Sequence, residues 1–154
     1  MTTSQTITKY GKPNVTGKGY LTVIDLPYPM RLAWDLDTIV TKVSCHKLIA
    51  EPLLNVFNQL LLQYTLEGLQ MLEIDIYGGC FNYRKMRNGN SWSKHSWGIA
   101  IDLNPEKNGL KTPYEKALFS EFVYEPMMDI FYHNGFINLG KEIGRDAMHF
   151  QIKE

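Results

Sequence analysis

The chain has 154 residues, of which 44% are hydrophobic and 21% are charged, values that exclude a disordered protein and fit a single domain over residues 1–154. Sixteen basic and sixteen acidic residues give no net charge, so bulk electrostatics offer no attraction for nucleic acid or for a membrane surface. The N-terminus has no apolar signal region and no apolar run is long enough to span a bilayer, so we expect a protein made in the cytoplasm without a signal peptide and without stable membrane insertion.

The first part of the chain predicts little regular structure before one long helix. Residues 1–20 are rich in Gly, Lys, Thr and Asn, which predicts an extended N-terminal arm. Residues 21–34 alternate apolar and turn residues and contain two prolines, which predicts a short edge strand followed by a packed loop. Between residues 45 and 68 apolar residues recur at steps of three and four, so we expect an amphipathic helix that starts near Glu51 and has Pro52 in its first turn.

Three further strands are expected in the second half of the chain. Residues 71–79, 96–104 and 148–152 show strand alternation, and residues 113–133 predict one or two helices broken by Pro126. Helices and strands do not follow the regular βαβ repeat of a parallel sheet. The pattern therefore favours an α+β domain with a small antiparallel sheet and flanking helices.

Two of the four histidines lie beside carboxylates, in SKHSWGIAIDLN and GRDAMHFQ. In the first segment, Asp102 shares a predicted strand face with Gly98 and Ala100, and such small neighbours leave space around its carboxylate. His95 precedes Asp102 by seven positions, and an odd spacing on an unbroken strand would put the two side chains on opposite faces. If the two meet, a turn or bulge must lie near residues 96–98, where Gly98 permits one.

In the last predicted strand, apolar residues alternate with His149, which places His149 on the polar face. Two imidazoles and one carboxylate suit Zn²⁺, and three protein ligands leave a fourth position for water, as in catalytic zinc sites. We therefore predict a zinc site made by His95, Asp102 and His149. Asp146, in the turn before His149, is a candidate to accept a proton from water and pass it to a leaving amine.

A basic segment and several alternatives complete this interpretation. Arg84 lies in a run that contains four basic residues and no acidic residue between Asp75 and Asp102, which favours an anionic substrate or forms a solvated loop. Taken alone, each histidine is more often structural, and an aspartate in a turn, such as Asp146, more often forms an Asx-turn. Non-haem iron oxygenases also use two histidines and a carboxylate. Their usual first pair is His-x-Asp on a double-stranded barrel, whereas here six residues separate the pair and the strands are too few.

SKHSWGIAID matches the S-x-H-x-x-G-x-A-x-D pattern of the D-alanyl-D-alanine carboxypeptidase family, the M15 peptidases, and DAMHF resembles their second motif. The resemblance covers roughly residues 74–152, and the chain looks like the small phage-type members, which include L-alanyl-D-glutamate endopeptidases used as endolysins. It implies the fold shared with the hedgehog signalling domain. It also implies roles for six residues: His95, Asp102 and His149 as zinc ligands, Asp146 as catalytic acid/base, Arg84 as the substrate- and oxyanion-stabilising arginine, and Ser93 close to the substrate.

The resemblance implies a zinc-dependent peptidase that acts on the peptide stem of peptidoglycan and reaches the cell wall through a holin-type pore or by virion delivery. The segment GFINLGKEIGRD at residues 135–146 departs from the Trp- and Gly-rich segment of many phage members, which puts the pocket wall and substrate preference in question. The alternative from another class is a non-catalytic zinc-containing module of the same fold that binds peptidoglycan or a partner protein.

Overall fold

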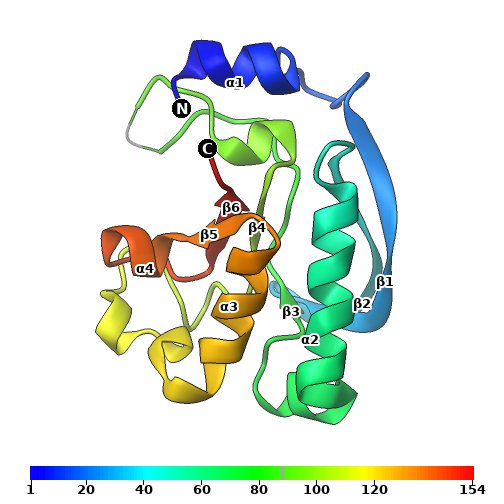
Figure 1. Ribbon diagram of the computed structural model, residues 1–154, viewed down its shortest axis with the longest axis vertical. Helices are drawn as coiled ribbons and strands as arrows, with labels where there is room; N and C mark the ends of the chain where they lie inside the picture. The colour runs from blue at the N-terminus through cyan, green and yellow to red at the C-terminus, as the bar shows by residue number, and fades with distance from the viewer. Residues whose placement is uncertain (88) are drawn as a thin grey trace.

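The computed structural model describes residues 1–87 and 89–154 and has the expected α+β architecture (Figure 1). Within this part of the chain, the strands form two small sheets, with strand orders β2-β1-β3 and β4-β6-β5. The main elements are α1 (Thr3–Tyr10), β1 (Leu21–Leu32), β2 (Asp35–His46), α2 (Ala50–Met71), β3 (Ile76–Tyr77), the 3₁₀ helix η1 (Lys94–Trp97), β4 (Ala100–Asp102), α3 (Glu125–His133), β5 (Phe136–Asn138), α4 (Leu139–Ile143) and β6 (His149–Ile152).

The prediction of an extended arm over residues 1–20 is wrong for its first half, which forms α1. The side chain of Thr2 accepts a hydrogen bond from the backbone of Gln5, and the Gln5 side chain accepts one from the backbone of Thr2, so the helix begins with a complete capping box. At the other end, the indole N–H of Trp97 donates to the Gly11 carbonyl at 2.7 Å. A tertiary contact with a residue far along the chain thus holds a helix that is too short to be stable alone.

Residues 21–34 also form more regular structure than predicted, because β1 and β2 make a long antiparallel hairpin. The ladder is irregular between Asp25 and Met30, and Pro27 and Pro29 lie in this interval. A proline cannot donate to a β ladder, so an irregular stretch is where a strand tolerates it. The hairpin continues into a short parallel pairing of β1 with β3.

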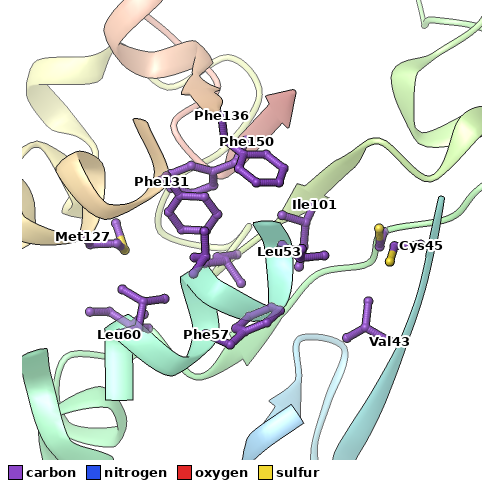
Figure 2. Close-up of a cluster of buried hydrophobic side chains, with 14 of the residues drawn as sticks. Val43, Cys45, Leu53, Phe57, Leu60, Ile101, Met127, Phe131, Phe136 and Phe150 are labelled. Atoms are coloured by element: carbon purple, nitrogen blue, oxygen red, sulfur yellow. The ribbon is translucent and has the colours of Figure 1, made fainter. Parts of the chain in front are cut away.

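Helix α2 begins at Ala50 with Pro52 in its first turn, as predicted. It packs against β1 on one side and α3 on the other, and forms the centre of the core (Figure 1). Figure 2 shows its buried side chains facing an aromatic cluster in which the rings of Phe131 and Phe150 stack with centroids 3.8 Å apart. This cluster attaches the β4-β6-β5 sheet to the helices, and that sheet carries the site described below.

The other expected elements are present with different limits. The strand expected over residues 71–79 is reduced to β3, and that over residues 96–104 to β4, because η1 takes up the start of the second segment. Residues 113–133 form three 3₁₀ turns and then α3. Pro126 lies in the first turn of α3 and starts this helix instead of breaking it, since the missing N–H has no helical partner there. Among the described residues, no helix is both long and apolar enough to cross a membrane.

Candidate active site

The side chains of His95, Asp102 and His149 converge on one point. One potential ligand atom from each lies within 4.8 Å of the others. His95 Nε2 is 3.2 Å from one carboxylate oxygen of Asp102, and His149 Nδ1 is 3.3 Å from the other. The three residues come from η1, β4 and β6, and the pairing of Asp102 with His149 in the antiparallel ladder places these two side by side.

A tight turn brings His95 to Asp102, as the odd spacing required. The Ser93 hydroxyl accepts a hydrogen bond from the His95 N–H at 3.2 Å and so caps η1. Gly98 ends η1 in the left-handed conformation, with φ of 68°. A side chain there would be strained, and its Cβ would lie 2.9 Å from the backbone nitrogen of His46. Gly98 therefore allows the chain to reverse between the two predicted ligands.

Each histidine uses one ring nitrogen for a protein contact and presents the other to Asp102. His95 Nδ1 donates to the carbonyl of Cys80 at 2.7 Å, which leaves the lone pair of Nε2 in the site. His149 Nε2 donates to the side-chain oxygen of Gln151 at 2.9 Å, which leaves the lone pair of Nδ1 in the site. Histidines that bind metals are typically oriented by such an outer hydrogen bond.

The donor atoms of this group fit a metal cation. His95 Nε2 and one oxygen of Asp102 are buried and have no hydrogen-bond partner in the part of the chain that the structure describes. Buried polar atoms are normally satisfied, because an unsatisfied one loses its hydration without compensation. Two imidazole lone pairs and a carboxylate around one point would be satisfied by a divalent ion of the borderline-soft type.

The electrostatics of the group agree with a negative charge on Asp102. Burial by itself raises the pKa of the Asp102 carboxyl, but the two imidazoles lower it by more, and the net pKa lies well below the ordinary value. Burial lowers the pKa of His149, but its contacts with Asp102 outweigh burial, and the net pKa is raised. The site thus holds an ionised carboxylate between two imidazoles.

Asp146 lies beside this group in an unusual backbone conformation. Its φ is 66°, in the left-handed region that aspartate tolerates better than most residues. The Asn138 side chain donates to the neighbouring Ala147 carbonyl at 2.7 Å and holds this turn against β5. One carboxylate oxygen of Asp146 is buried without a hydrogen-bond partner in the described residues, and burial raises the pKa of the group. A raised pKa suits a carboxyl group that exchanges protons near neutral pH.

A cavity of about 580 Å³ contains all six residues singled out from the sequence. Besides the three candidate ligands and Asp146, its lining includes Arg84 and Ser93. The Ser96 hydroxyl donates to the Arg84 carbonyl at 2.7 Å and accepts from the Arg84 N–H at 3.0 Å, which attaches this arginine to η1. The structure therefore brings together every predicted site residue, although Ser93 also has a structural part as the cap of η1.

Sequence reasoning missed three contributors to the site. The carbonyl of Cys80 orients His95, and a backbone group leaves no signal in a sequence. Gln151 orients His149, and its place two residues along the same strand face was the available signal. Arg145 also lines the cavity, and its position directly before Asp146 could have drawn attention to it.

Comparison with known proteins finds one family. Residues 87–152 match a family model described as D-alanyl-D-alanine carboxypeptidase. No curated protein and no solved structure matches the chain. The matched residues include His95, Asp102, Asp146 and His149, while Arg84 and the β1-β2 hairpin precede them. The part of the chain that carries the metal-binding group and Asp146 thus belongs to peptidase family M15.

Proposed function

We propose that this protein is a zinc-dependent peptidase that hydrolyses an amide bond in the peptide stem of peptidoglycan, as an L-alanyl-D-glutamate endopeptidase or a D,D-carboxypeptidase. The observation that carries the proposal is the arrangement of His95, Asp102 and His149 around one point, with an unpartnered oxygen of Asp146 in the same cavity. Membership of a peptidase family supports the same reaction class.

His95 Nε2, a carboxylate oxygen of Asp102 and His149 Nδ1 would hold the ion. Zinc bound there would lower the pKa of a coordinated water to about 7 and would polarise the scissile carbonyl. The remaining steps belong to side chains of this protein. Asp146 accepts the proton of the attacking water, and its raised pKa lets it return that proton to the leaving amine.

Arg84 is the candidate for stabilising the charge that develops on the carbonyl oxygen. It lines the cavity, and its backbone is attached to η1, which also carries His95. A positively charged donor held in place before the reaction stabilises an oxyanion without reorganisation. Ser93 is a candidate for a substrate contact, since it lines the same cavity.

The proposed setting is the cell wall, reached through a holin-type pore or by delivery with a virion. Purified cell walls would be incubated with zinc-loaded protein, with and without a chelator, and the released fragments identified by mass spectrometry. We expect peptide fragments that carry a new amino terminus, their loss with chelator, and their return on adding zinc. These fragments would name the bond. Binding to the wall without any released fragment would reject the peptidase and favour a non-catalytic module.

A further inference from the structure

One cation in the cavity has no part in the reaction as proposed above. Arg145 lines the same cavity as Arg84 but belongs to the turn between α4 and β6, whereas Arg84 precedes η1. In Figure 1 the segment of residues 82–93 lies above β6 and α4 lies below it. The two arginines therefore reach the cavity from different walls.

The base of the Arg145 side chain is well fixed. Its backbone forms an antiparallel bridge with Pro113, and the neighbouring Gly144 carbonyl accepts a hydrogen bond from the Tyr114 N–H at 2.8 Å. The guanidinium donates through Nη1 to the Leu110 carbonyl at 3.2 Å, and the rest of the exposed side chain borders the cavity. This single contact leaves several N–H donors for a ligand, because a guanidinium has five.

Neither arginine is neutralised by the protein. Among the described residues, no carboxylate oxygen lies within 4.0 Å of a guanidinium nitrogen of Arg145 or Arg84. Arg31, by contrast, makes two hydrogen bonds to Asp75, at 2.8 and 2.9 Å, and has no role in the cavity. An arginine that borders a cavity without a carboxylate partner is suited to bind one from a substrate.

The charges that line the cavity are unequal. Three arginines and one lysine line it, against two carboxylates that the proposed function already uses. Since the chain as a whole has no net charge, these cations are concentrated at this site. A bound divalent ion would add to the excess, so the cavity favours a substrate with more than one anionic group.

We propose that Arg145 is a specificity-determining residue that binds a carboxylate on the leaving-amine side of the scissile bond. This inference rests on the proposed function, in which Asp146 returns a proton to the leaving amine. Arg145 directly precedes Asp146 and lines the same cavity, so the part of the substrate that carries this amine lies along Arg145. A carboxylate there can accept two parallel hydrogen bonds from the guanidinium. Arg84, on the other wall, remains available to the scissile carbonyl.

The test uses two synthetic peptides built around the bond identified in the wall digest. They differ only in the leaving fragment, which ends in a free carboxylate in one and in a carboxamide in the other. The full-length zinc-loaded protein should prefer the carboxylate peptide by about tenfold or more in kcat/KM, as expected for a charge-assisted hydrogen bond. Arg145→Gln should abolish this preference through a higher KM for the carboxylate peptide, with kcat almost unchanged.

Two further variants separate recognition from loss of charge or of fold. Arg145→Lys should keep part of the preference, since it retains a positive charge but not the paired donors. Lys116→Gln removes an exposed cation outside this cavity and should keep the full preference. Zinc content and the midpoint of thermal unfolding would be measured for each variant.

The inference is overturned if the wild-type protein cleaves both peptides equally well. It is also overturned if Arg145→Gln, folded and loaded with zinc, keeps the preference for the carboxylate. A wall digest that releases no fragment rejects the peptidase function itself, so failure of the function and failure of the role of Arg145 are distinguished.

Discussion

Gln151 accepts a hydrogen bond from Nε2 of His149 across 2.9 Å, and this contact decides which nitrogen of the ring faces Asp102. The two residues lie on the same face of β6, two positions apart. With Nε2 protonated, Nδ1 carries the lone pair that a metal ion needs. The hydrogen bond thus fixes both the tautomer and the orientation of the ring.

Replacing Gln151 should weaken metal binding without removing a ligand. We expect Gln151→Leu to lower zinc affinity by roughly tenfold to a hundredfold, the range typical for loss of an outer hydrogen bond to a ligand histidine. Gln151→Glu, which keeps an acceptor oxygen, should restore most of it. Competition with a chromogenic chelator measures the affinity, and Gln63→Leu on the exposed face of α2 is the control. Equal affinity in Gln151→Leu and the wild type would contradict the role.

His149→Ala should lose the metal itself. It removes one of three candidate ligands and leaves the charge of Asp102 with a single imidazole beside it. We expect zinc bound by the purified variant to fall far below one ion per chain, measured by elemental analysis after dialysis against a weak chelator. The exposed His133 provides the matched control, His133→Ala, which should keep its zinc. Full stoichiometry in His149→Ala would remove it from the ligand set.

Asp146 should matter for the rate and not for the metal. Asp146→Asn keeps the size of the side chain and tolerates the left-handed backbone, but it cannot take up a proton. We expect kcat to fall by about 100-fold or more, with zinc content unchanged. Asp129→Asn, an exposed substitution on α3, is the control. Activity at the wild-type level in a zinc-loaded Asp146→Asn protein would exclude it as the acid/base group.

His46 should make folding stability depend on pH. It is buried against Tyr10 and Tyr20, where Nε2 donates to the Tyr10 carbonyl at 2.8 Å and Nδ1 accepts from the Leu48 N–H at 3.0 Å. Burial lowers the pKa of His46, and the neighbouring Lys47 lowers it further, against the opposing effect of the Tyr10 hydrogen bond. Only the neutral ring can accept the bond from Leu48.

Because the folded state holds His46 at a lower pKa than the unfolded chain, its contribution is fully present above the unfolded value of about 6.5. It is lost as the pH falls through the folded pKa, since the unfolded chain then binds more protons. Urea unfolding between pH 8 and pH 5 should show a smaller loss of stability in His46→Gln than in the wild type. His133→Gln should follow the wild type, and an identical pH dependence in all three proteins would refute the prediction.

Gly98→Ala should destabilise the fold. The left-handed conformation costs an alanine about 1–2 kcal/mol, and the new Cβ would lie 2.9 Å from the backbone nitrogen of His46. Gly68→Ala is the matched control, because a Cβ at this position in α2 meets only ordinary contacts and alanine favours a helix. Chemical denaturation should show a loss of at least about 1 kcal/mol for Gly98→Ala and none for Gly68→Ala. Equal stability of Gly98→Ala and the wild type would contradict the argument.

The residues of the candidate site could be predicted because their signals are local. The spacing in SKHSWGIAID required a reversal between His95 and Asp102, and Gly98 marked where the reversal occurs. Alternation in the last strand predicted that His149 and Gln151 share a face, as the hydrogen bond between them confirms. The periodicity of α2 and the position of Pro52 were readable for the same reason, since a side chain's face follows from its distance along a helix or strand.

Other features depend on contacts between segments that are distant in the chain, and only the tertiary structure decided them. Helix α1 is completed by a hydrogen bond from Trp97, and the β1-β2 hairpin accommodates two prolines through an irregular ladder. The free nitrogen of His95 is selected by a carbonyl at Cys80, and Arg145 reaches the cavity because its turn is bridged to Pro113. Sequence determined which side chains can bind a metal and on which face each lies. Strand register and packing decided where those faces meet, because their free energies arise from contacts that no local pattern records.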